Sequence, residues 1–215
     1  MRRELDAAWR LGVAGLLAAA LLAGVWALTR ERIAEEERRV ELLAMAMVLP
    51  PALYDNDPLG DTLRVCAGDD LGPGAHTVYR ARRGGEPVAL AITATAPDGY
   101  SGRIELLIGL DIDGRVLGVR VVRHRETPGL GDAIEAEKSD WIERFHGLFL
   151  GEPPVERWKV RRDGGDFDQF AGATVSPRAV VGALRRALEF HAREGGRLFA
   201  EDAPAELRCA TPIPM

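Results

Sequence analysis

The feature that most constrains this chain is an uninterrupted apolar run near its N-terminus. Residues 11–28 (LGVAGLLAAALLAGVWAL) contain no charged side chain. As a helix the run would span about 27 Å, close to the roughly 30 Å of a bilayer's hydrocarbon core. Arg10 and Arg30 flank the run, and Trp9 and Trp26 lie near its ends, which is typical of spanning helices. The sequence therefore predicts a single transmembrane helix over about 11–28.

Two other interpretations of the apolar run compete with a membrane anchor. A cleaved signal peptide has a shorter apolar core, of roughly 7–15 residues, and no clean Ala-x-Ala site follows this run. A helix buried in a protein core would not be expected to be apolar on every face at the end of a chain. Arginines lie on both sides of the run, so the positive-inside rule does not decide its orientation. The interleaved glutamates and the long domain that follow favour a cytoplasmic N-terminus with the domain outside.

The rest of the chain has the composition of an ordinary globular protein. Hydrophobic residues make up 47% of the 215 residues, and the net charge is −5 with no basic cluster free of acids, which argues against a nucleic-acid partner. The cysteines Cys66 and Cys209 have no CxxC or CxxH spacing, which argues against a zinc or iron–sulfur site. In an oxidising compartment they would form one disulfide, and otherwise they are unrelated thiols.

The pattern of apolar residues predicts an α+β domain of antiparallel strands with flanking helices. A charged helix is expected over 30–48 and a long Pro/Gly/Asp-rich loop over 50–75. The expected strands are 77–82, 88–95, 104–111, 116–122 and 155–161, of which the first four form two hairpins. A short helical piece is expected over 139–145. A longer helix is expected from Pro177 to about Arg193, with Ser176 as its N-cap.

The expected organisation of the chain has four parts. These are an N-terminal segment with the transmembrane helix (1–29), a helical linker and loop (30–75), the folded α+β domain (76–202), and a loose C-terminal tail (203–215).

The first segment with chemical potential is 168–177 (DQFAGATVSP). Small residues lead into a helix start and place the hydroxyl of Thr174 beside unpaired backbone N–H groups, which favour an anion. Gly172 and Ala173 leave room for a bulky group to approach the backbone. The segment therefore suits a phosphate near Thr174, while an ordinary helix cap after a turn is the simpler interpretation of the same residues.

The second segment is 124–132 (HRETPGLGD), in which two glycines and a proline shape a tight turn. His124, Glu126 and Asp132 are conceivable metal ligands, but a solvated turn is the simpler interpretation, and we predict no metal. The chain has no G-x-S-x-G elbow and no G-x-G-x-x-G strand–helix unit. It is therefore not expected to oxidise NADH alone.

Together these segments resemble one known family. The chain is similar to the G subunit of the Rnf electron-transport complex and, more distantly, to the C subunit of the sodium-translocating NADH:quinone reductase. The resemblance extends from the anchor to about residue 195. It is densest in 98–102 (DGYSG), in 124–132 with 139–142 (SDWI), and in 163–180.

The resemblance implies a covalently bound FMN. In that family the threonine that ends the small-residue motif is esterified by the FMN phosphate, which a flavin transferase installs from FAD. The matching acceptor is Thr174, and Asp168 belongs to the flavinylation motif. The other residues implied near the cofactor are Gly172, Ala173 and Ser176 beside the phosphate and Thr127, Gly129, Leu130 and Gly131 near the flavin ring. Ala171 departs from the family, which usually has Ser or Thr there.

The resemblance also implies a function. The chain is expected to carry electrons as a subunit of a membrane complex that couples electron transfer between ferredoxin and NAD to ion translocation, with no catalytic residue beyond the flavin. Its expected partners are the other subunits, the flavin transferase and membrane lipid, and its expected location is the inner membrane with a periplasmic domain. The alternative is an anchored extracytoplasmic binding or sensor domain without a redox cofactor, in which Thr174 only caps a helix.

Overall fold

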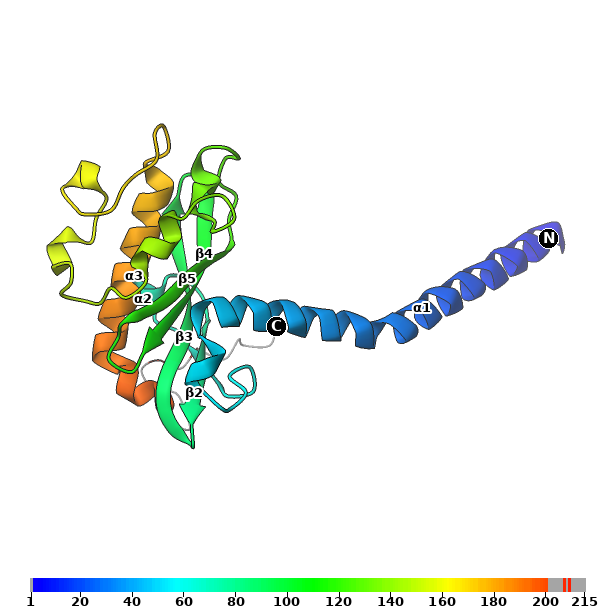
Figure 1. The fold of residues 1–215 in the computed structure, drawn as a ribbon. Helices are drawn as coiled ribbons and strands as arrows, with labels where there is room; N and C mark the ends of the chain where they lie inside the picture. Colours follow the sequence, from blue (N-terminus) through cyan, green and yellow to red (C-terminus); the bar gives the residue numbers. More distant parts are fainter. Residues whose placement is uncertain (1, 201–206, 208, 210–215) are drawn as a thin grey trace. The chain divides into compact units, whose positions relative to one another are not determined.

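The structure is a computed structural model that describes residues 2–200, 207 and 209 (Figure 1). Within the first helix, the side chains at 2–8, 10, 11, 14, 17, 31, 34, 37 and 40 lie outside the description. The chain divides into two compact units, residues 1–43 and residues 44–215.

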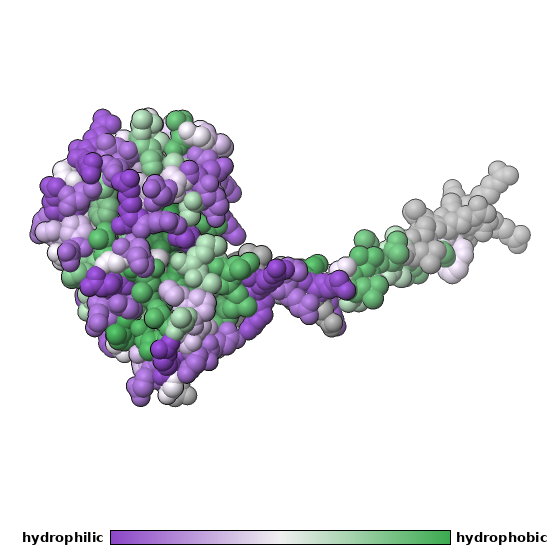
Figure 2. Space-filling view, viewed as in Figure 1, coloured by the Kyte–Doolittle hydropathy of each residue, from purple (hydrophilic) through white to green (hydrophobic). Residues whose placement is uncertain are grey.

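The first unit belongs to helix α1 (Arg2–Val48), which confirms the helix predicted over 30–48. Among the residues that the structure describes, no helix is both long enough and apolar enough to cross a membrane. The predicted span 11–28 includes Leu11, Ala14 and Leu17, whose side chains lie outside the described residues. Within the run, Leu16, Leu21, Leu22, Val25, Trp26 and Leu28 are 51% to 81% exposed, and Figure 2 shows a hydrophobic stretch of this helix next to a hydrophilic one.

The second unit is built on a five-stranded antiparallel sheet in the order β1-β2-β3-β4-β5. The strands are β1 (Thr62–Val65), β2 (His76–Arg83), β3 (Glu86–Gly99), β4 (Gly102–Asp111) and β5 (Val116–Arg123). Each strand pairs with its neighbour in sequence. Both predicted hairpins are therefore confirmed, because their alternating residues and turn signals are local features of the sequence.

The predicted loop over 50–75 is wrong in part. It contains a 3-10 turn (Pro51–Leu53), strand β1 and a short helix α2 (Gly68–Leu71). Strand β1 has only four residues, and they alternate between exposed and buried. Four alternating residues in a Pro/Gly-rich region are too few to predict a strand from the sequence. The strand forms because these residues pair with β2.

The strand predicted over 155–161 is also wrong. The segment forms two 3-10 turns, Val155–Arg157 and Arg161–Asp163. Trp158 and Val160 are both buried, which produced the strand-like alternation. They pack into an aromatic cluster with Phe145 and Phe167 rather than into a sheet, and an isolated bridge between Val160 and Phe167 is what remains of strand pairing. The piece predicted over 139–145 is a 3-10 helix, η3 (Trp141–Phe145).

Helix α3 (Val175–Glu194) covers one face of the sheet (Figure 1). The helix buries residues that recur at helical spacing, namely Val180, Val181, Leu184, Leu188 and His191. The helix begins two residues before the predicted start. Thr174 occupies the N-cap position, so the prediction of Ser176 as N-cap is wrong.

The end of α1 packs on the opposite face of the sheet. Met45, Val48 and Leu49 are buried there in a second apolar cluster. Gly109 and Gly118 face each other across β4 and β5, and a Cβ at Gly109 would lie 1.9 Å from the carbonyl oxygen of Val48. The backbone of this last turn of the helix therefore lies directly on the sheet, and it belongs to the second compact unit, which begins at Ala44.

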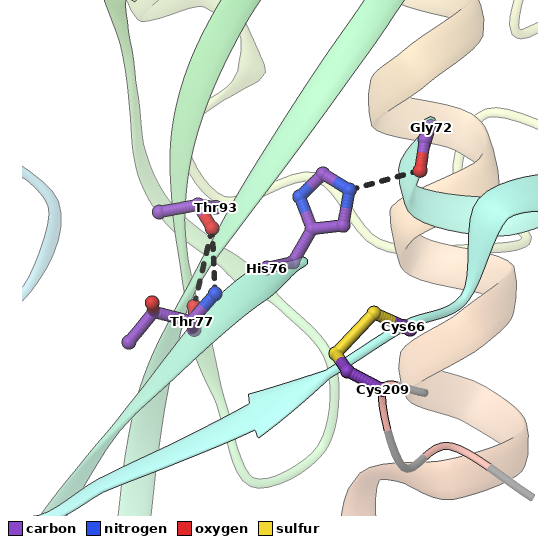
Figure 3. Close-up of a disulfide and its surroundings, with 6 residues drawn as sticks. All are labelled: Cys66, Gly72, His76, Thr77, Thr93 and Cys209. Carbon is purple, nitrogen blue, oxygen red and sulfur yellow. Dashed lines mark hydrogen bonds between the residues drawn. A yellow bond between two sulfur atoms is a disulfide. The ribbon is translucent and has the colours of Figure 1, made fainter. Parts of the chain in front are cut away.

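Cys66 and Cys209 form a disulfide with a Cα–Cα distance of 5.0 Å (Figure 3). The structure therefore decides between the two interpretations of the cysteines in favour of the bond. The backbone N–H of Cys66 also donates a hydrogen bond of 2.8 Å to the carbonyl of Leu207, which is buried. Of the tail predicted over 203–215, Leu207 and Cys209 are described and are held against the domain, while the other residues lie outside the description.

Candidate functional site

Three segments that are distant in sequence line one cavity of about 320 Å³. They are the turn between β3 and β4, the turn after β5, and the loop that enters α3. The cavity is lined by Tyr100, Glu126, Thr127, Leu130, Gly131, Gly172, Ala173, Thr174, Val175 and Ser176. The structure thus brings together all the residues expected near the cofactor except Gly129. Gly129 belongs to the same turn but does not line the cavity.

Thr174 is the N-cap residue of α3, but its side chain does not form a capping hydrogen bond. A tight turn precedes it, in which the N–H of Ala173 bonds to the carbonyl of Phe170 (3.1 Å) and Gly172 has a φ of 76°. Thr174 has helical dihedrals and makes no capping hydrogen bond through its side chain. It is half-buried. The first amides of a helix have no acceptor within the helix, so a partly exposed hydroxyl lies beside N–H groups that need an acceptor from outside it.

A buried carboxylate joins the three segments. Glu126 is 4% exposed, and its Oε1 accepts a hydrogen bond of 3.0 Å from the backbone N–H of Ser101. Its Oε2 accepts a hydrogen bond from the hydroxyl of Ser176, which is 1% exposed. The Glu126 side chain, which belongs to the turn after β5, therefore binds both the β3–β4 turn and the start of α3.

The bond to Glu126 changes the assignment of Ser176. Its hydroxyl was expected to cap α3, but it is buried beneath the cavity and bonded to the carboxylate. Gly131 fits closely beside this pair, because a Cβ at that position would lie 2.6 Å from Oγ of Ser176. The Ser176 residue can face a bound anion only through its backbone N–H.

The residues considered as metal ligands have protein partners. The backbone N–H of Glu126 bonds to Nδ1 of His124 (3.0 Å), and Nε2 of His124 lies 2.7 Å from Oε1 of Glu135. Asp132 lies 3.9 Å from Nζ of Lys138. Within the described ranges, no three His, Cys, Asp or Glu side chains are placed to hold a metal ion.

Two large side chains form an exposed rim around the cavity. Leu130 is 47% exposed, and a Cβ at Gly172 would lie 3.9 Å from its Cδ2. Hydrogen bonds from the N–H groups of Leu130 and Gly131 to the carbonyl of Thr127, both 3.1 Å, close the turn. Tyr100, which is 72% exposed, was not predicted as a site residue. The signal that could have found it is the DGYSG segment, one of the densest parts of the resemblance.

Asp168 does not line this cavity. Its carboxylate pairs with Arg161, at 2.8 Å, and with Arg144. Its carbonyl accepts a hydrogen bond of 2.8 Å from the indole of Trp141. These residues border a second cavity of about 370 Å³. Asp168 is therefore an ion-paired acid at the edge of the second cavity. Trp141 also contacts Phe170, which begins the turn before Thr174.

A separate ion pair lies at the start of α3. The guanidinium of Arg178 donates two hydrogen bonds to Asp163, of 2.5 and 2.9 Å, and these hold the pKa of Asp163 below its usual value. The backbone N–H of Arg178 bonds to the carbonyl of Thr174 at 3.2 Å. The side chain of Arg178 is thus engaged by an acid and is not a free cation beside the Thr174 hydroxyl.

The cavity offers a specific combination of chemical groups. At one end are a hydroxyl and free amides, which suit an esterified or bound phosphate. At its rim are a leucine and a tyrosine, which suit a flat apolar ring. The volume is at the lower end of the roughly 300–1,000 Å³ of small-molecule sites, so a larger ligand would lie partly in solvent.

The comparisons with known proteins agree with this location. Residues 99–189 match the family described as "FMN-binding domain". This range includes every residue that lines the Thr174 cavity.

Several relatives cover most of the chain, and each is named as the G subunit of an ion-translocating oxidoreductase complex. The protein from Stutzerimonas stutzeri is 51% identical over 182 residues, which are 85% of this chain and 78% of that protein. The protein from Pseudomonas aeruginosa (strain UCBPP-PA14) is 47% identical over 205 residues, 95% of this chain and 96% of the relative. The protein from Escherichia coli (strain K12) is 45% identical over 187 residues, 87% and 86% of the two chains.

Proposed function

Because the chain belongs to the family of G subunits of the Rnf ion-translocating oxidoreductase complex, we propose that it carries FMN covalently on Thr174 and relays electrons within that complex. The observation that supports the attachment most directly is the hydroxyl of Thr174. It makes no capping bond, it is half-buried, and it borders a cavity inside the segment that matches an FMN-binding domain.

The proposed attachment is a phosphoryl transfer with FAD as donor. A bond forms between Oγ1 of Thr174 and the FMN phosphorus, the bond from that phosphorus to the AMP oxygen breaks, and AMP leaves while the hydroxyl proton is lost. The flavin transferase is the proposed catalyst of this step. In the product, the first amides of α3 and the small residues Gly172 and Ala173 accommodate the phosphate.

FMN supplies the electron transfer when it is bound, and the chain supplies its position. The phosphoester fixes one end of the cofactor, which matters for a domain with no surrounding pool of free FMN. Leu130 and Thr127 line the same cavity. We propose that they contact the ring, the first through an apolar surface and the second through a hydroxyl. Gly131 lets the turn pack closely on Ser176 and Glu126 beside the proposed cofactor, and Gly129, with a φ of 75°, shapes the same turn.

We place the domain outside the cytoplasm, anchored by residues 11–28 in the inner membrane. Apolar side chains exposed along that part of α1 favour contact with lipid. The disulfide between Cys66 and Cys209 favours an oxidising compartment, because disulfides rarely persist in the cytosol. The proposed partners are therefore the other subunits, membrane lipid and, during maturation, the flavin transferase.

Asp168 has a proposed role in maturation rather than in holding FMN. It lies outside the Thr174 cavity, and its two arginine partners keep it at the surface of a neighbouring hollow. A fixed carboxylate six residues before the acceptor is suited to orient the transferase. The connection through Trp141 and Phe170 ties this surface to the turn that presents Thr174.

The test is the mass of the purified chain produced together with a flavin transferase. We expect one FMN-sized adduct on the peptide that contains Thr174, and a yellow colour that survives denaturation and washing. Thr174→Val should abolish the adduct, since it removes the hydroxyl and keeps the side-chain shape. Thr174→Ser is the matched control, because it restores a hydroxyl at the same backbone position.

Two results would overturn the assignment. One is an adduct that persists in Thr174→Val, and the other is an adduct that maps to Ser176. A colourless chain in the presence of an active transferase would favour the alternative of a binding or sensor domain without a redox cofactor.

A further inference from the structure

Tyr100 combines features that suit a binding residue. In the described part of the second unit, the large apolar side chains that remain exposed are Met47, Tyr100, Ile112, Val122 and Leu130. Tyr100 is the most exposed of these at 72%, and Tyr100 and Leu130 both line the Thr174 cavity. An exposed aromatic ring on the rim of a cavity is typical of ligand contacts.

The backbone under Tyr100 is held in place from several directions. Gly99 pairs with Gly102 across the β3–β4 turn, and a Cβ at Gly99 would lie 2.3 Å from the carbonyl oxygen of Gly102. The next residue, Ser101, donates its N–H to the buried carboxylate of Glu126. The turn is therefore fixed before any ligand binds, which lowers the ordering cost of a contact made by its side chain.

Glu126 also fixes where Tyr100 lies relative to the proposed attachment point. The same carboxylate binds Ser101, next to Tyr100, and Ser176, two residues after Thr174. The tyrosine and the acceptor threonine are thus tied to one buried group from two sides. A ring tethered through Thr174 has Tyr100 and Leu130 as its large apolar neighbours on the cavity rim.

We propose that Tyr100 stacks on the isoalloxazine of FMN and forms, with Leu130, the site that holds the ring. This inference rests on the proposed attachment to Thr174 and adds a ring contact to it. The phenol face covers part of the ring that would otherwise meet water, since offset aromatic stacking favours such contacts. Tyr100 is a cofactor-binding residue in this arrangement, and Glu126 is the positioning residue beneath it.

Stacked tyrosine has an optical signature that a merely structural residue lacks. An excited isoalloxazine takes one electron from a phenol in contact with it, and the electron returns as the pair relaxes, so fluorescence is quenched with no net reaction. Phenylalanine stacks in the same way but is a much poorer electron donor. Tyr100→Phe should therefore keep the contact and lose the quenching.

The experiment uses the full chain in detergent, produced with a flavin transferase. Covalent FMN is quantified for each variant after denaturation, and the fluorescence of the native protein is divided by that amount. Tyr100→Phe and Tyr100→Ala should both carry a full complement of FMN and fluoresce several-fold more than the unaltered chain. Tyr54→Phe is the matched control, since Tyr54 packs with the cluster on the other face of the sheet, and it should not change the fluorescence.

The outcomes separate this inference from the proposed function. If Tyr100→Phe is no brighter per FMN than Tyr54→Phe, Tyr100 does not stack on the ring and the inference is overturned while the attachment stands. If the unaltered chain carries no covalent FMN, the proposed function itself fails and the ring contact fails with it. Tyr100 is exposed, so neither substitution is expected to disturb folding.

Discussion

Replacing Ser176 by alanine tests the central packing feature of the site. The change removes the hydroxyl that donates to Oε2 of Glu126 and leaves that buried oxygen without this donor. A hydrogen bond to a charged group contributes about 1.5–3 kcal/mol. For a unit of this size, that loss corresponds to a fall in Tm of about 3–12 °C. The proposed covalent attachment at Thr174 should persist, because the substitution leaves the Thr174 hydroxyl unchanged.

The assay is thermal unfolding of the full chain, compared with a matched serine substitution. Ser101→Ala is the control, because Ser101 reaches Glu126 through its backbone N–H, which alanine keeps. A double-mutant cycle of Ser176→Ala with Glu126→Gln should give a coupling energy above about 0.5 kcal/mol. A coupling near zero, or a Ser176→Ala chain as stable as Ser101→Ala, would refute the claim that this bond joins the segments.

Two further predictions concern groups outside the cavity. Asp168→Asn should reduce FMN incorporation. It should lower the free energy of unfolding by at most about 1 kcal/mol, because exposed ion pairs contribute little to stability. Incorporation is measured against Asp166→Asn, and equal values in the two variants would contradict the role of Asp168 in maturation. Burial lowers the pKa of His191 below its usual 6.5. The unfolded chain therefore binds the proton first, and stability should fall as pH drops below about 6.5. His191→Gln should weaken this dependence in unfolding measured at several pH values, and an unchanged dependence would exclude His191 as its source.

The sequence was sufficient where local patterns decide the structure. The two hairpins follow from alternating residues and their turn signals, and the buried face of α3 follows from helical spacing. The position of Thr174 at a helix start follows from small residues before an apolar stripe, although the helix begins two residues earlier than expected. The same locality explains the error over 155–161, where Trp158 and Val160 alternate as in a strand but pack among aromatic rings.

Other features depend on contacts between residues far apart in the chain. Glu126 meets Ser101 across 25 residues and Ser176 across 50, and Cys66 meets Cys209 across 143. No local sequence pattern predicts these contacts, because they form only when the strands pair and α3 packs across the sheet.

The sequence by itself therefore determined the apolar run, the hairpins, the family resemblance and the choice of Thr174 as the proposed acceptor. Only the tertiary structure decided that Glu126 is buried beneath the site, that Ser176 bonds to it, and that Tyr100 lies at its rim. The physical reason is that the first set depends on residues adjacent in the chain, whereas the second depends on burial and on hydrogen bonds that exist only after the segments have packed together.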